Sequence, residues 1–344
     1  MKSFDTFIWS SDYESFTGEG LLARCFVENY FKTHEIIKIS SNNKEYLFKK
    51  KKYLLLKKNI YKNNFWTKYL YPLYGVVLIW YYHIKGKKTC YVNYLPLWNI
   101  LIFIFLPSST ILGPITGSIF NEKAYNFNTI CRKIFFPIFY FISLKVVFFK
   151  YKYVIFSTNN LKKIIPKNKL KFCLFNFCLL FYNKRKIKNK NIDFLFYLRE
   201  HPQKSNSFLT YIIKNLAFLN LKIVIVGDKY NHPKIKNYEN IDRSKLLYLL
   251  DRTKYSVTSG DNFFSLFFLD CISSNVFTFF NKKFKPGETF LQNYSAQSLN
   301  YNKFDLSFSN IINKLNKKNN RVSVNKKYFS KEKKNILNFL KNRL

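Results

Sequence analysis

Residues 192–198, "IDFLFYL", begin the stretch that decides the fold. This apolar run has the length of a strand, and an amphipathic helical pattern at 207–219 and a second apolar run, "KIVIVG" at 222–227, follow it. Near-continuous apolar strands are typical of parallel sheets that are covered by helices on both faces. The alternation therefore predicts an α/β unit.

The same alternation continues toward the C-terminus. It predicts a helix at 243–253 with Asp242 as its N-cap, a strand at 255–259 and a strand at 276–280. A lysine-rich tail ends in a further helical pattern at 330–344, for which Ser330 is the expected cap.

The first half of the chain has a similar order. A strand at 6–10, a polar loop with two glycines and a helical pattern at 21–31 form the start of a Rossmann-like unit. Further strands are predicted at 35–40, 89–94, 110–112 and 153–157.

The basic, polar segment 182–191 interrupts two apolar regions and marks a change of domain. We expect an α/β protein with two Rossmann-like domains facing a cleft, an N-terminal domain at 1–185 and a C-terminal domain at 186–344. The helix at 330–344 either stays with the second domain or packs back on the first.

The composition limits the choice of partners. The net charge is +39, but only eight of the 58 basic residues are Arg, and Asn, Ile, Phe and Tyr are abundant, as an AT-rich coding sequence would produce. The charge is therefore weak evidence for nucleic-acid binding, and nucleic acid is not an expected partner. A basic surface still favours anionic partners such as phosphate groups or lipid headgroups. Scattered cysteines without zinc spacing, and an N-terminus that turns polar early, indicate a cytoplasmic protein.

Two apolar, aromatic stretches bear on membrane binding. Residues 134–149 contain Pro137 and Lys145 and fall short of the roughly 20 residues that a bilayer span requires. Together with residues 74–82 they form either an interfacial surface that docks on anionic lipid or two ordinary core helices. The sequence leaves both interpretations open.

Glycine is rare, so its positions are informative. Six of the nine glycines come just after predicted strands, where open α/β sheets bind ligands: Gly18, Gly20, Gly113, Gly117, Gly227 and Gly260. Each also has a simpler explanation, because glycine is the default residue for a backbone turn of positive φ. No G-x-G-x-x-G, Walker lysine motif or Asp-x-Asp pair accompanies them.

The stretch "SGDNFFSLFFLDC" at 259–271 places an acid, Asp270, in an apolar helical segment. A buried Asp requires compensation, so Asp270 lies either on a solvated edge or against a polar ligand. The glycine loop before this helix leads into its N-terminus, where unpaired N–H groups favour an anion.

The order "YLREHPQK", "VIVGD" and "SGDNFFSLFFLDC" resembles the GT-B glycosyltransferases, especially the retaining family 4 (group 1) type. The resemblance is strongest from 192 to 281 and only architectural before that. It implies that Arg199 and Lys204 hold the donor diphosphate, with Arg199 alternatively pairing with Glu200 at a domain edge. Asn262 and Asp270 stand where that family has two acidic residues.

The same resemblance assigns roles at the donor site. Asp270 would bind the ribose hydroxyls, and Asn262, or the neighbouring Asp261, would face the donor sugar. The remaining implied donor contacts are the backbone amides of Phe264, Ser265 and Leu266 and the loop of Gly18 and Gly20.

The implied function is transfer of a sugar from a nucleotide-sugar donor to a glycan or lipid-linked acceptor, in bacterial surface polysaccharide or lipopolysaccharide synthesis. The resemblance implies work at the inner face of the cytoplasmic membrane, with catalytic Arg199, Lys204 and Asn262 and neither metal nor cofactor. Because Asn262 replaces an acid, a non-catalytic nucleotide- or glycan-binding protein is the alternative. A basic nucleic-acid-binding protein is the third.

Overall fold

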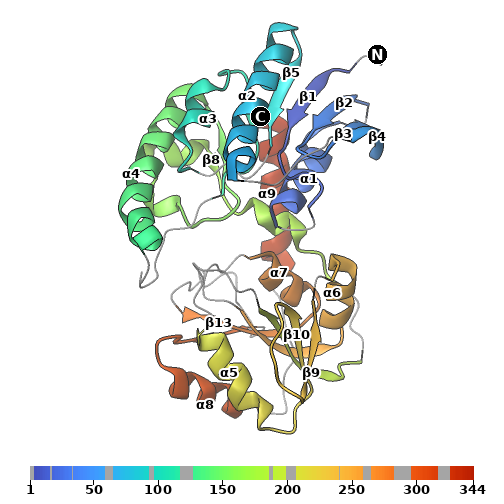
Figure 1. Ribbon diagram of the computed structural model, residues 1–344, viewed down its shortest axis with the longest axis vertical. Coiled ribbons are helices and arrows are strands. Elements are labelled where there is room, and N and C mark those ends of the chain that lie inside the picture. Colours follow the sequence, from blue (N-terminus) through green and yellow to red (C-terminus); the bar gives the residue numbers. More distant parts are fainter. Residues whose placement is uncertain are drawn as a thin grey trace. The chain divides into compact units, whose positions relative to one another are not determined.

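The computed structural model (Figure 1) describes residues 4–15, 18–32, 34–58, 65–92, 97–116, 127–185, 189–198, 207–239, 241–258, 265–282, 296–316 and 326–344. The chain divides into two compact units. The first comprises Met1–Phe177 and Lys334–Leu344, and the second comprises Cys178–Lys333.

The first unit is built on a six-stranded sheet of order β4-β3-β2-β1-β5-β6. Its parallel strands are β1 (Thr6–Trp9), β2 (Ile37–Ser40), β5 (Lys88–Tyr91) and β6 (Ile111–Leu112). All four lie at or near the predicted positions. β7 (Val154–Ile155) pairs with β8 (Cys173–Leu174) in a separate small sheet.

A hairpin that the sequence pattern did not predict extends this sheet. β3 (Lys44–Lys49) and β4 (Lys52–Lys58) are antiparallel, and the turn residues Lys50 and Lys51 have φ of 50° and 60°. Two-residue hairpin turns need positive φ at both positions and favour Asn-Gly. Two lysines there gave no turn signal, so the first sheet is mixed and not fully parallel.

Helices cover both faces of the first sheet. α1 (Gly18–Tyr30) buries Ala23, Phe26 and Val27 on one side. On the other side, Phe7, Trp9 and Tyr91 of the sheet share a core with three helices. These are α2 (Phe65–Ile84), α3 (Ile100–Phe105) and α4 (Phe127–Lys150), which Figure 1 shows side by side with α3 between the other two.

Within the described residues, no helix combines the length and apolar character that a membrane span requires. The segments Lys162–Ile164, Lys167–Phe172 and Phe177–Phe181 form short 3-10 turns. The last helix, α9 (Lys326–Arg343), begins four residues before Ser330, so the prediction that Ser330 caps it is wrong. Its final turns belong to the first unit, where the ring of Phe339 lies 5.8 Å from that of Tyr153.

The second unit contains a six-stranded, fully parallel sheet of order β11-β10-β9-β12-β13-β14. In sequence order within the unit this is 3-2-1-4-5-6, the doubly wound Rossmann order. The strands are β9 (Ile192–Leu198), β10 (Ile223–Gly227), β11 (Ile235–Tyr238), β12 (Thr253–Val257), β13 (Phe277–Asn281) and β14 (Ala296–Leu299).

Helices sandwich this second sheet as the alternation predicted. α5 (Ser207–Ala217) and α8 (Phe304–Leu315) pack on one face, and α6 (Arg243–Leu250) and α7 (Leu266–Ser273) pack on the other. The Asp242 carboxylate accepts a hydrogen bond of 2.7 Å from the backbone N–H of Lys245, which confirms the predicted N-cap. β11, β14 and α8 were not predicted, because "IKNY" and "AQSL" are too short and polar to stand out.

Candidate functional site

Helix α7 begins at the topological switch point of the second sheet. The strand order reverses between β9 and β12, and α7 follows the carboxyl end of β12. Open α/β sheets bind ligands in the crevice at this point. The first N–H groups of α7 have no partner within the helix, so its start also favours an anion.

Ser265 fixes where α7 starts. Its backbone is extended (φ −61°, ψ 150°), and its hydroxyl accepts a hydrogen bond of 3.2 Å from the N–H of Phe268. The Ser265 side chain therefore works as an N-cap. The amides of Ser265 and Leu266 consequently lie at the helix N-terminus, where the predicted phosphate contact would need them.

Asp270 lies in the middle of α7 and is 3% exposed. Its Oδ1 accepts a hydrogen bond of 2.5 Å from Nη2 of Arg243, and the Arg243 guanidinium lies 5.3 Å from the ring centre of Phe181. Burial raises the pKa of Asp270 to about 6, while the nearby charges of Arg243 and Arg185 lower it. The compensation that a buried Asp requires is therefore supplied inside the unit by Arg243, a residue that the sequence pattern did not single out.

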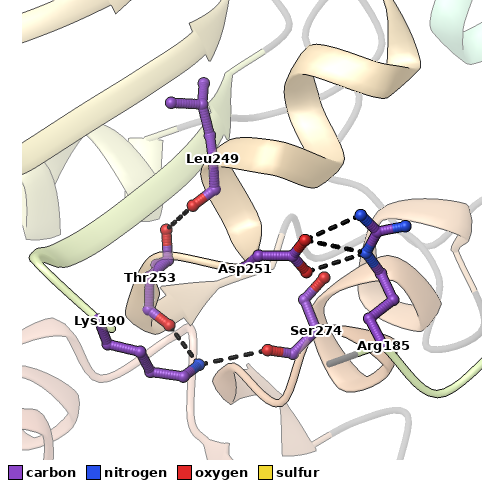
Figure 2. Close-up of polar contacts among 6 residues, drawn as sticks. All are labelled: Arg185, Lys190, Leu249, Asp251, Thr253 and Ser274. Atoms are coloured by element: carbon purple, nitrogen blue, oxygen red, sulfur yellow. Dashed lines mark hydrogen bonds and ion pairs between the residues drawn. The ribbon is translucent and has the colours of Figure 1, made fainter. Parts of the chain in front are cut away.

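A second ion pair supports the base of α7 (Figure 2). Arg185 holds Asp251 through Nε and Nη2 at 2.8–3.2 Å, and Asp251 is almost fully buried. Lys190 donates to the carbonyl oxygens of Thr253, Ser274 and Asn275 at 2.6, 3.3 and 2.7 Å. Burial lowers the pKa of Lys190 to about 8.

Both cations lie on the segment that leads into β9. Arg185 binds the carboxylate of Asp251, the C-cap of α6, and Lys190 binds carbonyl oxygens at the start of β12 and after α7. Thr253, whose hydroxyl donates to the carbonyl of Leu249 at 2.8 Å, joins α6 to β12 in the same network. These hydrogen bonds fix the position of α7, and therefore of Asp270, relative to the sheet.

In the first unit, the loop after β1 occupies the corresponding edge. Arg24 of α1 donates to the carbonyl oxygens of Tyr13 and Ser15, which folds this loop over the start of α1. A Cβ at Gly20 would overlap the carbonyl oxygens of Asp12 and Ser15. Gly20 therefore has a packing reason to be glycine whatever ligand the loop meets, and Gly18 is the first residue of α1.

Gly227 also has a local explanation. It ends β10 with φ of 109°, and a Cβ there would overlap the carbonyl oxygen of Leu198. Backbone conformation and close strand approach account for these glycines, so their position after strands is weaker evidence for a ligand than their number suggested.

Several buried polar atoms on segments that follow strands of the first sheet have no hydrogen-bond partner among the described residues. Within the described ranges, four buried oxygens there accept or donate no hydrogen bond: Ser10 Oγ, Glu14 Oε2, Asn42 Oδ1 and Thr116 Oγ1. They follow β1, β2 and β6, while the hydroxyl of Ser41 donates to the other oxygen of Glu14. Burial raises the pKa of Glu14. Orphaned buried polar groups are costly, and a hydroxyl-rich ligand would satisfy them.

The other predicted site residues lie outside the described residues: Arg199, Lys204, Asp261, Asn262 and Phe264. Their roles stay predictions. The structure does place the chain on both sides of them, since β9 ends at Leu198 and Ser265 precedes α7. Leu198 ends β9 and Ser265 comes after β12, and the strand order reverses between these two strands.

Nearly the whole chain is similar to the solved structures of several enzymes. Sucrose-phosphate synthase from Thermosynechococcus elongatus is 11% identical, with 98% of this chain and 95% of that chain covered and a TM-score of 0.62. UDP-GlcNAc 2-epimerase from Methanocaldococcus jannaschii, in complex with UDP-GlcNAc and UDP, is 12% identical over 96% and 98% of the chains, with a TM-score of 0.52. A glycosyltransferase from Rickettsia africae is 13% identical over 99% and 95%, also with a TM-score of 0.52.

No protein-family model and no curated protein sequence matches the chain. At these low identities the similarity establishes the fold, and the chain has the GT-B fold of two Rossmann-like α/β domains. The expected fold class is confirmed. The finer expectation of a retaining family 4 enzyme is not decided by these structures.

Proposed function

We propose that the protein is a glycosyltransferase that uses a nucleotide-sugar donor. The observation that carries the proposal is a GT-B fold over nearly the full chain, with helix α7 starting at the switch point of the second unit. Two similar structures support the choice of donor, because one is a UDP-GlcNAc enzyme with bound UDP and another is a glycosyltransferase.

The start of α7 would bind the donor diphosphate. As the glycosidic bond breaks, the leaving nucleoside diphosphate gains negative charge, which the amides of Ser265 and Leu266 stabilise more in the transition state than in the ground state. Arg199 and Lys204, on the segment after β9, would add fixed cations. A metal ion or cofactor has no role in this proposal.

Asp270 would accept hydrogen bonds from the ribose hydroxyls. This role requires an ionised carboxylate, and its pKa of about 6 leaves Asp270 ionised at neutral pH only because Arg243 and Arg185 oppose the effect of burial. Arg243 is thus proposed as a positioning residue, which fixes the carboxylate and keeps its charge. Asn262 or Asp261 would face the donor sugar, and transfer would retain the anomeric configuration.

The acceptor would bind at the carboxyl edge of the first sheet, beside the first turn of α1. Gly18 and Gly20 lie in this turn and not in the loop that the sequence predicted. The unpartnered oxygens of Ser10, Glu14 and Asn42 suit a hydroxyl-rich molecule. We propose a glycan or lipid-linked acceptor of bacterial surface polysaccharide or lipopolysaccharide synthesis, glycosylated at the inner face of the cytoplasmic membrane.

Purified full-length protein, incubated with a panel of nucleotide sugars, tests the proposal through release of nucleoside diphosphate. Release that depends on an added acceptor, with retained anomeric configuration by NMR, is the expected result. Nucleotide binding by thermal shift without any release would favour a non-catalytic binding protein. Conversion of UDP-GlcNAc without an acceptor would indicate an epimerase, and neither binding nor release would refute the proposal.

A further inference from the structure

Three neighbouring helices of the first unit expose an apolar stripe. On α4, large apolar side chains recur at helical spacing, and Phe141 and Phe149 are 58% and 90% exposed. On α2, Val77 and Ile84 are 62% and 78% exposed. The complete stripe comprises Leu70, Tyr74, Val77, Trp80, Tyr81 and Ile84 of α2, Leu101, Ile104 and Phe105 of α3, and Ile134, Phe135, Ile138, Phe141, Ile142 and Phe149 of α4.

The three stripes meet at the carboxyl ends of their helices. The indole N–H of Trp80 on α2 donates to the carbonyl oxygen of Phe105 on α3 at 2.6 Å. Lys150 at the end of α4 donates to three carbonyl oxygens of the same turn of α3, those of Phe103, Ile104 and Leu106. Figure 1 shows the helices as one layer on one face of the sheet. The exposed side chains therefore form one continuous surface, hereafter the α2–α4 face.

The sequence around the α2–α4 face is strongly basic, and two exposed lysines, Lys85 and Lys145, lie on the face itself. Between residues 46 and 192 the sequence has 27 Lys and Arg but a single acid, Glu122. The exposed Lys145 lies within the α4 stripe, its Nζ 4.4 Å from the ring centre of Phe141, and Lys85 lies over Tyr81 at 4.1 Å. Such lysines extend apolar stems over an apolar surface and present their charge at its border.

We infer that the α2–α4 face docks on an anionic lipid bilayer, with the three helices lying in the interface. Exposed Leu, Ile and Phe would enter the acyl region, Trp80 and Tyr81 suit the headgroup level, and the lysines would meet acidic headgroups. A second copy of the chain is a poorer occupant, because a self-complementary interface would bring the same lysines together without acidic partners. Of the two interpretations that the sequence left open, the exposure of these helices favours the interfacial surface.

Co-sedimentation of the full-length protein with vesicles tests the inference. We expect binding to vesicles of phosphatidylcholine with about 30 mol % phosphatidylglycerol and weak binding to phosphatidylcholine alone, with a steep loss in salt. The variant Val77→Glu/Phe141→Glu should lower the partition coefficient at least tenfold. Phe218→Glu/Leu306→Glu, which changes exposed apolar residues of the second unit (73% and 54% exposed), is the matched control and should bind like the unchanged protein.

A charge series tests the second half of the inference. Lys85→Gln and Lys145→Gln should each weaken binding to anionic vesicles about fivefold, because each surface lysine contributes on the order of 1 kcal/mol. The control pair Lys234→Gln and Lys236→Gln, exposed lysines of the second unit, should change little. Quenching of Trp80 fluorescence by brominated lipid, lost in Trp80→Phe, gives a readout independent of sedimentation.

Equal binding of the face and control variants would overturn the inference, as would equal binding to neutral and anionic vesicles. A change from dimer to monomer in Val77→Glu/Phe141→Glu, with vesicle binding unaffected, would assign the face to a second copy. Thermal unfolding of each variant excludes misfolding. Vesicle binding needs no donor, so this inference does not rest on the proposed function, and the two can fail separately.

Discussion

Replacing Arg243 by Met should destabilise the second unit in a way that depends on pH. Arg243 is the cation bonded to the buried Asp270, and Met preserves much of its apolar bulk against Phe181. Without the guanidinium, burial alone acts on Asp270, and its pKa in the folded state rises well above 6.

The magnitude follows from proton linkage. The pKa of Asp270 is raised from 3.8 to about 6 in the folded protein, so the folded protein holds this proton more tightly than the unfolded chain. The free energy of unfolding therefore falls as pH rises through 6. At pH 7.5 it is about 3 kcal/mol lower than at low pH. In Arg243→Met the carboxyl of Asp270 stays protonated at pH 7.5. Holding that proton so far above the ordinary carboxyl pKa lowers the free energy of unfolding by about 5 kcal/mol. The variant should therefore lose about 2 kcal/mol by linkage and about 1 kcal/mol more from the hydrogen bond.

Urea unfolding at pH 7.5 and at pH 5.0 measures this difference. At pH 5.0 Asp270 is mostly protonated in both proteins, so the linkage part vanishes and about 1 kcal/mol should remain. The double variant Arg243→Met/Asp270→Asn should recover at least about 2 kcal/mol at pH 7.5, because an amide avoids the cost of holding a proton at that pH. An equal loss at both pH values, or no recovery in the double variant, would refute the assignment of Arg243 as the compensating charge.

Three further predictions concern the donor site and the fold. The affinity for UDP, measured by calorimetry, should weaken at pH values below 6, where Asp270 becomes protonated. In Asp270→Asn the affinity should be weaker and should not depend on this titration. An unchanged affinity would show that Asp270 does not bind the ribose. Ser265→Ala should cost about 1 kcal/mol in urea unfolding through loss of the N-cap of α7, and Ser265→Asp should restore it. Replacing Lys50-Lys51 by Asn-Gly should raise the free energy of unfolding by about 0.5–1 kcal/mol, since both positions have positive φ; a loss would contradict the turn geometry.

Much of the second unit could be predicted because its central strands are apolar on both faces. The pattern placed β9 at its observed residues and β10, β12 and β13 within two residues of theirs. The edge strands β11 and β14 could not be predicted in this way, because each has one neighbouring strand and carries polar side chains. The β3–β4 hairpin was hidden for a related reason, because lysines occupy both its turn and its exposed strand.

The site was harder to predict because its contacts join distant parts of the chain. The pattern identified Asp270 as an acid that needs a partner, but Arg243 lies on another helix, 27 residues away in sequence. Arg185 and Asp251 are 66 residues apart. Only the crossover of the strand order brings α6, α7 and the segment before β9 together, so no local spacing encodes these pairs.

The rarity of arginine in the sequence nevertheless draws attention to the arginines of the site. With 50 Lys and eight Arg in the chain, lysine is the default cation, and two of the described arginines, Arg24 and Arg185, each use two donor nitrogens at once. Arg24 bonds two carbonyl oxygens, Arg185 holds both oxygens of Asp251, and Arg243 holds Asp270. A lysine ammonium can also bond several carbonyl oxygens, as Lys150 and Lys190 do, but it does not reproduce the planar two-nitrogen contact of Arg185 with the Asp251 carboxylate. The same argument gives weight to the proposal that Arg199, the residue after β9 in sequence, binds the paired oxygens of a diphosphate.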